Sequence, residues 1–559
     1  MKASSAVLLG AAAFARHAAA AAVFAHYMVG GITQDHANTD IQDAINVGFD
    51  AFALNLMSTE DWSTEAVASL FTAASGTDFK LFFSFDMGHF SDPSQFLPIL
   101  EQYASHNNYY QYDSKPFVST FDGGKLTFGS SSPNAGWQST FKDAASAAGV
   151  DVFFVPDFDD ASGYPDSFFD TFSVVDGAFS WESAWPYEDA GFANVSDTVD
   201  STMIDAAHNA GKIYMMPLST FQFKHLDTSD NWYRRGESNL YVRMGQILDL
   251  KPDLVEVITW NDPGEGHYIG NFWNESLGNT NIYEYAGGFD HTGWQKVISP
   301  FITAYKNGTS AISEITASSN VGTMWYRTLL TTASCSDDSI GLPRSHENAQ
   351  DAINYAIILP DSGSDYTINV YSNNNLIGTA EGVTGLNGGS VLGLAAGSAD
   401  TQRVEVVKTS SDGATTTILA ATGTKNVGCK CCWLFGSCFD GGSSGINLEF
   451  VGTLHNFINV VCFFTSNFIT NVTYTGNSSS IHCTNDLINV NLNNCTNHHL
   501  TQNNYNSNYN NCLFLPTRQI RVPMGPFRRA LRQRNSPGRA QPRIQQTRSQ
   551  RWLLNYPSP

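Results

Sequence analysis

Short runs of apolar residues alternate with segments of helical periodicity through the first 310 residues of the chain. Most of these runs are continuous, which is typical of parallel strands that are buried on both faces. The segments between them repeat apolar residues every three or four positions, as at Trp137, Phe141, Ala144 and Ala148, and this spacing predicts helices with one buried face. Eight strands are therefore expected, at Val23–Val29, Phe49–Met57, Phe79–Met87, Lys115–Phe121, Val150–Phe158, Val175–Trp181, Lys212–Ser219 and Leu254–Asp262.

Eight alternations of strand and helix predict an α/β fold, a (β/α)8 TIM barrel over residues 23–310. The extent of this region suits the fold, which usually takes about 250 residues. A doubly wound open sheet is the alternative. It is disfavoured because no glycine-rich phosphate loop follows any of the strands, and because an open sheet has no place for an eighth, closing strand.

The pattern changes after residue 310. Short alternating runs, such as Tyr366–Tyr371 and Arg403–Val407, are separated by Gly, Asn and Ser turns and predict a β-sandwich over residues 311–428. This accessory domain either supports or binds substrate, or only packs against the barrel, and the sequence leaves both open. Residues 429–559 follow as an irregular tail of low complexity, which we expect to be disordered.

Charge and cysteine both separate the tail from the rest of the chain. All ten basic residues from Arg518 onward are arginines with no acid among them, so the net charge of −22 becomes about −32 for residues 1–517. An acidic body disfavours nucleic acid and other polyanions and is compatible with a neutral polymer. Eight of the nine cysteines lie in residues 429–512, which would suit a disulfide module of undecided pairing. We instead interpret the tail as a translated intron or a shifted reading frame, an artefact of the gene model.

The N-terminus predicts export. Lys2 precedes the apolar stretch Ala6–Ala15 and small residues suited to cleavage, so residues 1–22 are expected to be a signal peptide. The stretch is too short to span a membrane. The protein is therefore expected to be secreted, extracellular or in a cell wall, as a monomer. Three sequons that fit N-glycosylation are at Asn194, Asn274 and Asn307.

Polar and aromatic residues follow the predicted strands, where a barrel of this kind carries its functional groups. After the eighth strand, Asp262 and Glu265 lie three residues apart across a Pro-Gly turn, and we take them as a catalytic acid and base. Asp86 is a third catalytic candidate, with a structural cap as its alternative role. Amides and carboxylates bind sugar hydroxyls, and flat rings stack on sugar faces, so this rim is typical of a glycosidase. The candidate substrate-binding residues are His26, Tyr27, Asn55, Asp157, Trp181, Trp185, Tyr187, Trp232, Trp260, Asn261 and His267.

Metal chemistry finds no support in the sequence. The histidines show no ligand spacing, and neither an HExxH motif nor a CxxC pair lies within the predicted barrel. We expect no metal and no other cofactor.

The strand-end motifs together resemble glycoside hydrolase family 71, the fungal endo-1,3-α-glucanases also called mutanases. The resemblance covers roughly residues 22–425 and implies endo-acting hydrolysis of α-1,3-linked glucan, of fungal wall or mutan, with inversion at the anomeric carbon. It implies that Asp262 and Glu265 form the catalytic pair and that Asp86 contributes to activity. Within the pair we assign Glu265 as the acid and Asp262 as the base. The motifs that carry it are Ala25–Gly30, Phe52–Asn55, Phe83–Met87, Trp232–Glu237, Trp260–Glu265 and Trp325–Arg327.

The chain departs from the family pattern at Pro263, where an aromatic residue is expected, and at Gly266, where a serine is expected. A weakly catalytic α-glucan-binding wall protein on the same barrel is therefore one alternative function. Another is a different barrel glycosidase, such as a retaining β-glucanase. Those enzymes usually present Asn-Glu after strand four and Glu after strand seven, whereas these strands end here at Asp122 and Ser219.

Overall fold

A computed structural model describes residues 21–188, 190–278, 280, 282–312, 320–334, 338–360 and 365–430, with backbone alone at 284, 429–430, 448–449, 471–473 and 482–484. The chain divides into a unit of Met1–Gly452 with Arg551–Pro559 and a unit of Thr453–Gln550. In the second unit, β22 (Asn471–Thr473) pairs antiparallel with β23 (His482–Thr484). The predicted signal peptide and tail lie almost wholly outside the described residues.

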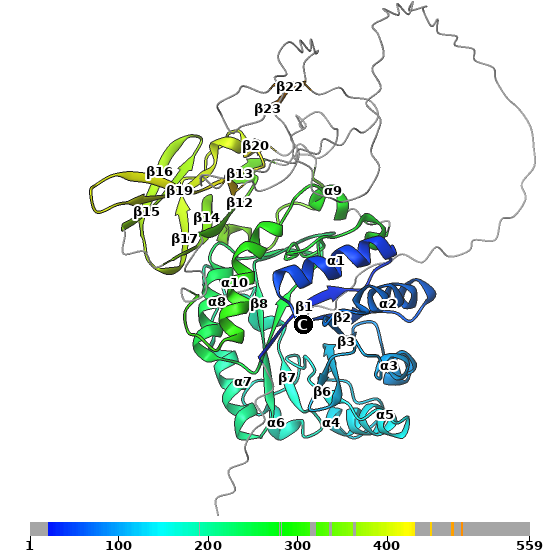
Figure 1. Ribbon diagram of the computed structural model, residues 1–559. Helices are drawn as coiled ribbons and strands as arrows, with labels where there is room; N and C mark the ends of the chain where they lie inside the picture. The colour runs from blue at the N-terminus through cyan, green and yellow to red at the C-terminus, as the bar shows by residue number, and fades with distance from the viewer. Residues whose placement is uncertain are drawn as a thin grey trace, which may run out of the picture. The chain divides into compact units, whose positions relative to one another are not determined.

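Parallel strands form one curled sheet that is surrounded by helices (Figure 1). Their order is β6-β5-β3-β2-β1-β11-β8-β7, and the short strand β4 (Gln111–Tyr112) adds to β5 in the antiparallel sense. An isolated parallel bridge joins Asp157 to Phe179, so the two ends of this order approach each other. Each predicted strand overlaps an observed one: β1 (Ala22–Met28), β2 (Ala51–Leu56), β3 (Lys80–Asp86), β5 (Lys115–Phe121), β6 (Phe153–Phe154), β7 (Gly177–Phe179), β8 (Ile213–Ser219) and β11 (Leu254–Ile258).

Helices fill the connections between the strands, as their apolar spacing predicts. The segment that begins at Pro133 runs through three consecutive helical pieces, and its Trp137 and Phe141 are fully buried. Within the described residues, no helix combines the length and apolar character needed to cross a bilayer. The helices are α1 (Gln34–Val47), α2 (Asp61–Ala74), α3 (Leu97–Tyr103), α4 (Pro133–Gly136), the π-helix η2 (Trp137–Lys142), α5 (Asp143–Ala147), α6 (Phe168–Thr171), α7 (Thr198–Asn209), α8 (Asn239–Leu250), α9 (Ile282–Ala286) and α10 (Gln295–Lys306).

Alternation along the strands separates two buried layers. The rings of Phe24 and Phe82 pack with centroids 5.0 Å apart, and Phe82 packs on Phe117 at 4.8 Å, inside the curve of the sheet. The neighbouring positions face the helices, where Tyr27 packs on Phe52 at 4.9 Å. His26 lies two residues after Phe24 in the same strand, so its side chain faces the inner side of the sheet, as that of Phe24 does.

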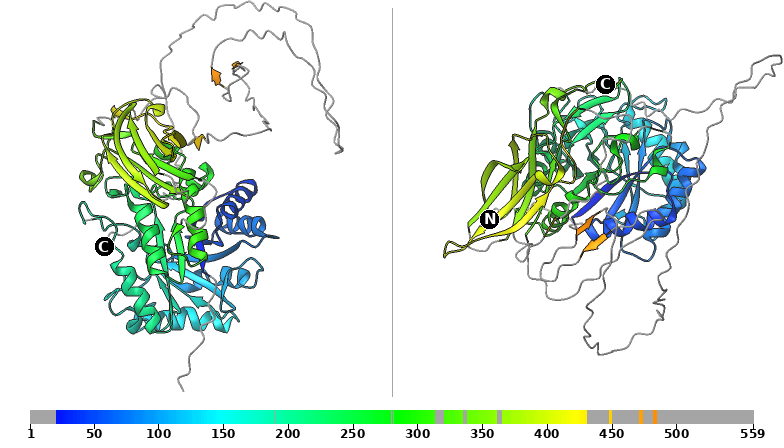
Figure 2. Two further views of the ribbon diagram at one scale, coloured as in Figure 1. Left: turned by 60° about the vertical axis from the view of Figure 1, so that its left-hand side comes forward. Right: turned by 90° about the horizontal axis from the view of Figure 1, so that it is seen from above.

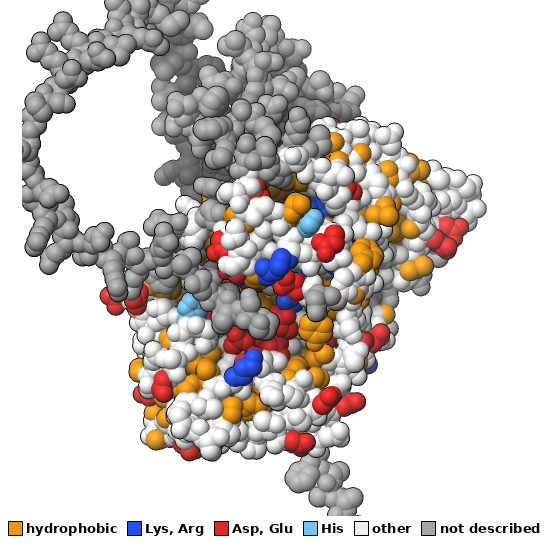
Figure 3. Space-filling view, turned by 180° about the vertical axis from the view of Figure 1, so that it is seen from behind, with side chains coloured by type: hydrophobic (Ala, Val, Ile, Leu, Met, Phe, Trp, Pro, Cys, Tyr) orange, Lys and Arg blue, Asp and Glu red, His pale blue; other side chains and the backbone are white. Residues whose placement is uncertain are grey.

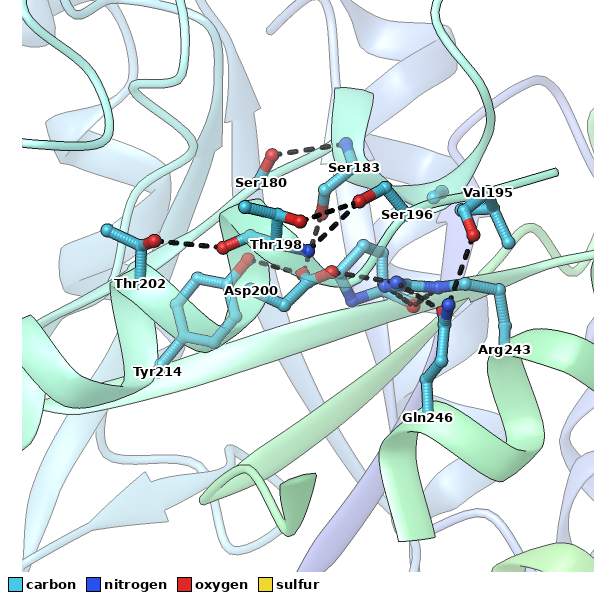
Figure 4. Close-up of polar contacts among 12 residues, drawn as sticks. Ser180, Ser183, Val195, Ser196, Thr198, Asp200, Thr202, Tyr214, Arg243 and Gln246 are labelled. Atoms are coloured by element: carbon cyan, nitrogen blue, oxygen red, sulfur yellow. Dashed lines mark hydrogen bonds and ion pairs between the residues drawn. The ribbon is translucent and has the colours of Figure 1, made fainter. Parts of the chain in front are cut away.

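A buried ion pair connects helices α7 and α8, which flank β8 (Figure 4). Arg243 of α8 donates to Asp200 of α7 at 2.7 Å, and both side chains are fully buried. Asp200 also accepts hydrogen bonds from Ser183 and Tyr214, each at 2.8 Å. Since Ser183 lies in the 3-10 turn η3 (Glu182–Ala184), this network fixes the loop that carries Trp181 and Trp185.

A β-rich region follows α10 and packs beside α8 and α10 (Figures 1 and 2). Its two main sheets have the orders β12-β14-β17 and β16-β15-β18-β19-β21, where β21 is the short strand Leu448–Glu449, and they share one apolar core. Strand β14 contributes Tyr355 and Ile357 to this core and Ala356 and Ile358 to the larger core. The domain boundary at residue 310 stays a prediction, because both cores belong to one unit. The strands are β12 (Val321–Tyr326), β13 (Leu329–Ser334), β14 (Ala352–Leu359), β15 (Asp365–Ser372), β16 (Asn375–Gly382), β17 (Gly385–Leu392), β18 (Arg403–Thr409), β19 (Thr415–Thr422) and β20 (Gly428–Lys430).

Candidate active site

Acidic side chains gather in a hollow on the face of the molecule drawn in Figure 3. The C-terminal ends of the parallel strands supply carboxylates to one rim, because parallel strands all end at the same edge of a sheet. Asp86 ends β3, Asp122 follows β5, and the segment after β11 carries Asp262 and Glu265.

The turn after β11 brings Asp262 and Glu265 together. The Asp262 carboxylate accepts a hydrogen bond from the Glu265 backbone N–H at 3.1 Å, and the Asp262 N–H donates to the Thr259 hydroxyl at 3.0 Å. Gly266 follows with a φ of +77°, a left-handed conformation that glycine adopts without strain. One oxygen each of Asp262 and Glu265 and one nitrogen of His267 all lie within 4.8 Å of one another.

Glu265 is surrounded by hydrogen-bond donors. Lys224 lies 3.2 Å from one carboxylate oxygen, His267 Nε2 lies 3.1 Å from the other, and the Gln222 amide donates to it as well. Burial favours the neutral form of Glu265 and raises its pKa. The Lys224 ammonium, His267 and the Gln222 hydrogen bond have the larger effect, so the pKa of Glu265 lies well below its ordinary value. Glu265 is therefore a stable carboxylate.

Asp262 has the opposite electrostatics. Burial, the largest influence, raises its pKa; His267 lowers it and the neighbouring Glu265 charge raises it further. Two carboxyl groups with pKa values pushed apart are the arrangement of an acid and a base. These shifts favour Asp262 as the acid and Glu265 as the base, the reverse of the assignment made from the sequence. No sign of this is visible in the sequence, because the lysine that stabilises the Glu265 carboxylate lies 41 residues away in the chain.

A second wall of the site comes from β1, β2 and β3. His26 Nδ1 lies 2.6 Å from Glu256 on β11, and both side chains are buried. Burial raises the pKa of Asp86 to about 7, although the Gly88 N–H, His26 and Asn55 lower it. His26 Nε2, Asn55 Oδ1 and Asp86 Oδ2 are buried and have no hydrogen-bond partner among the described residues. Buried polar atoms are normally paired, so these three are suited to a ligand rich in hydroxyl groups.

Aromatic rings join the two walls. The Trp181 ring centroid lies 4.8 Å from His26 and 6.0 Å from His267, and the Trp185 ring lies 5.3 Å from His267. Asp157, whose pKa is raised chiefly by burial, accepts a hydrogen bond from the Trp181 N–H at 3.2 Å. Asp157 therefore positions the loop that presents these rings.

Two groups of side chains within the described residues have the spacing to hold a cation. One is Asp262, Glu265 and His267; the other is Asp122, Asp157 and Asp159. In the first group the Lys224 ammonium already faces Glu265. In the second, burial raises the pKa of Asp122 to about 7 and of Asp159 to about 6, aided by repulsion from neighbouring carboxylates. Neither group shows a feature that requires a metal.

Residues 19–435 match the family model of glycosyl hydrolase family 71. The chain belongs to this family. It is a glycoside hydrolase, and the resemblance of its strand-end motifs to the family is thereby confirmed.

Three curated relatives carry glucanase names. "Glucan endo-1,3-alpha-glucosidase agn1" of Schizosaccharomyces pombe is 36% identical over 372 residues, which cover 65% of this chain and 83% of that protein. "Ascus wall endo-1,3-alpha-glucanase" of the same yeast is 30% identical, covering 66% and 85%. "Mutanase Pc12g07500" of Penicillium rubens is 31% identical, covering 63% and 75%.

The structure does not bring three candidate residues of this family 71 chain into the site. The Tyr27 hydroxyl donates to Asp40 of α1 at 2.9 Å, and Trp260 is fully buried with its ring 5.2 Å from Phe52, on the helix side of the sheet. Asn261 bonds the backbone N–H and C=O of Met28 at 2.8 and 3.0 Å. Their predicted contact with substrate finds no support, because each side chain stabilises the fold instead.

The remaining substrate-binding candidates differ in exposure. Trp181, Trp185 and His267 are buried near the candidate pair Asp262 and Glu265, whereas Tyr187 is 56% exposed. Trp232 is half-buried on the hairpin that supplies Lys224, and its indole N–H donates to Gln222 at 3.3 Å.

Glu256 and the contact of Lys224 with Glu265 were not identified from the sequence. Glu256 is the single acidic residue within the apolar run of β11, and such an isolated charge is itself a signal of a buried partner. That partner, His26, lies 230 residues earlier, and no local pattern connects the two.

Proposed function

We propose that this family 71 enzyme hydrolyses α-1,3-glucosidic bonds within α-glucan of a fungal cell wall or mutan, with Asp262 and Glu265 as its acid and base. The proposal rests on one observation. The two carboxyls face each other at the end of β11, and their pKa values are shifted in opposite directions. The names of the curated relatives support the α-1,3-glucan substrate.

The proposed roles follow the electrostatics. Asp262, with its raised pKa, donates a proton to the oxygen of the leaving sugar, while Glu265 accepts a proton from the water that attacks the anomeric carbon. Asp86, His26 and Asn55 bind hydroxyl groups of the sugar on the opposite wall. Trp181, Trp185 and Trp232 supply apolar faces for sugar rings.

Inversion at the anomeric carbon rests on the family resemblance. The two carboxyls approach within 4.8 Å, whereas inverting glycosidases usually separate theirs by about 6.5–9.5 Å to admit a water. Proton NMR of the first product distinguishes the outcomes, because inversion of an α-linked glucan releases the β-anomer and retention releases the α-anomer.

The surrounding architecture completes the proposal. We infer that the curled sheet closes as a (β/α)8 barrel through the Asp157–Phe179 bridge, and that the β-rich region forms a sandwich beside it. Export and N-glycosylation are part of the same proposal. The asparagines of the three sequons that precede residue 429, Asn194, Asn274 and Asn307, are exposed.

The test is incubation with insoluble α-1,3-glucan beside α-1,4- and β-1,3-glucans. We expect new reducing ends from the α-1,3-glucan alone, and a loss of at least about 100-fold in Glu265→Gln. Glu101→Gln, the same change at an exposed position of α3, is the matched control and should retain full activity. Tight binding of α-1,3-glucan by the wild type without release of reducing ends would favour a binding protein instead.

A further inference from the structure

The hairpin that contacts Glu265 is held from outside the barrel. Strands β9 (Gln222–His225) and β10 (Asn231–Arg234) form an antiparallel pair directly after β8, and β9 carries Gln222 and Lys224. The segment of residues 338–350, which leads into β14 of the β-rich region, lies along β10. We call residues 338–350 the clamp segment.

Backbone hydrogen bonds join the clamp segment to β10 through one parallel bridge, between Trp232 and Arg344. The Arg344 N–H donates to the Asn231 carbonyl and the Tyr233 N–H donates to the Arg344 carbonyl, both at 2.9 Å. The Asn231 side-chain amide adds bonds to the carbonyls of Gly341 and Leu342, each at 3.2 Å. These bonds stabilise a two-stranded hairpin that would be marginal by itself.

Charged side chains of the clamp segment reach toward the site. Asp338 lies 3.1 Å from His225, the residue next to Lys224, and the two side chains are only 13% and 6% exposed. The Arg344 guanidinium lies over the Trp232 ring at 5.5 Å, and the Lys224 ammonium lies over the same ring at 4.8 Å.

Arg344 also connects the hairpin to the loop that carries the site tryptophans. Its Nε donates to Glu188 at 2.7 Å, and the hydroxyl of the next residue, Ser345, donates to the Glu188 carbonyl at 2.9 Å. Glu188 follows Trp181 and Trp185 on the loop after β7. One short segment therefore contacts both the hairpin and the loop that carries Trp181 and Trp185.

A displacement of the hairpin would be transmitted to Glu265. Lys224 and Gln222 both contact the Glu265 carboxylate, and Trp232 bonds Gln222 at 3.3 Å. A misplacement of about 1 Å at a catalytic group can cost roughly 100-fold in rate.

We propose that Asp338 and Arg344 are positioning residues of the active site: they hold the β9–β10 hairpin, and through it they hold Lys224 and Gln222 against Glu265. The β-rich region then contributes to hydrolysis, because two of its residues position the hairpin that contacts Glu265. This inference rests on the proposed role of Glu265.

The experiment compares Arg344→Ala and Asp338→Asn with Arg403→Ala. Arg403 is a matched control, because it also pairs with a carboxylate, Glu405 at 2.7 Å, and lies over an aromatic ring, Tyr371 at 4.4 Å, away from the hairpin. We would measure kcat and KM on a soluble α-1,3-linked glucose oligosaccharide, the midpoint of thermal unfolding, and hydrogen exchange of the backbone amides of residues 222–234.

We expect both clamp variants to lose about 10–100-fold in kcat, with KM within about twofold and faster exchange in the hairpin. Arg403→Ala should match the wild type. Unchanged kcat in both variants would overturn the proposal, and so would a rise in KM alone, since that indicates direct substrate contact. If the wild type hydrolyses no α-1,3-glucan but the clamp variants still loosen the hairpin, the proposed function fails while the structural role of the clamp segment stands.

Discussion

Replacement of Lys224 by Met tests the electrostatic basis of the proposed catalytic pair. The substitution removes the ammonium and keeps an unbranched apolar chain in a site where the lysine is only 1% exposed. Glu265 then loses the cation at 3.2 Å and keeps the contacts of His267 and Gln222.

The size of the effect follows from the distance. At an effective dielectric constant of about 20, two unit charges 3.2 Å apart attract by roughly 5 kcal/mol. Each pKa unit corresponds to about 1.4 kcal/mol. The pKa of Glu265 should therefore rise by at least about 1 unit and by at most about 4, because water and His267 take over part of the stabilisation.

The assay is the pH dependence of kcat/KM on a soluble α-1,3-linked glucose oligosaccharide. Glu265 must be ionised to accept a proton, so activity is lost as pH falls through its pKa. In the wild type, with that pKa well below its ordinary value, we expect this acidic limb well below the pH at which an ordinary glutamate titrates. In Lys224→Met the limb should move upward into the measurable range. The groups that face Glu265, namely Asp262, His267 and Tyr285, are unchanged.

Lys142→Met is the control for loss of a partly buried, paired lysine. Lys142 pairs with Asp176 at 2.7 Å, at the end of the strands opposite to the site, so its replacement should leave the limb in place. A folded Lys224→Met enzyme with a wild-type acidic limb would refute the reasoning, because Glu265 would then not be the carboxylate that Lys224 holds ionised.

Three further predictions concern other parts of the molecule. Asp86 has a pKa of about 7, so if its neutral form binds the sugar, activity should fall as pH rises through 7, and Asp86→Asn should abolish this limb in a kcat/KM profile. Arg243→Met leaves Asp200 as a buried charge without its cation and should lower the free energy of unfolding by about 3–5 kcal/mol in urea denaturation, whereas exposed Lys296→Met should change it by less than about 0.5 kcal/mol. Mass spectrometry of protein secreted by a fungal host should find glycans at Asn194, Asn274 and Asn307 and no peptides from residues 453–550; abundant peptides from that range would refute our interpretation of the tail.

The positions of the strands were predictable, because burial on both faces of a strand requires a continuous apolar run in the sequence. The lengths of the strands were less predictable than their positions. The predicted strand Val150–Phe158 contains only Phe153–Phe154 as a regular strand, since Pro156 has no N–H to donate to a ladder. The backbone beyond it still reaches the neighbouring strand, with the Asp157 N–H donating to the Thr120 carbonyl at 3.1 Å.

The site was predictable where residues follow a strand end and share its inner side. His26 and Asp86 meet this condition, and the structure places them on one wall. Tyr27 does not, because successive side chains of a strand face opposite sides, and its neighbour His26 faces inward. Contacts between distant segments, such as His225 with Asp338, leave no local trace in the sequence.

The separation of acid from base illustrates why the motif alone was insufficient. Asp262 and Glu265 lie on one turn, both largely withdrawn from water, and burial alone would raise the pKa of each. What distinguishes them is Lys224, a residue of a different strand, on a hairpin paired with Arg344 of the β-rich region. A barrel that kept both carboxyls but lost this lysine would hold Glu265 ionised less strongly, through His267 and Gln222 alone. The proposed roles within the pair thus depend on the tertiary structure, and the proposed role of the clamp segment is part of that dependence.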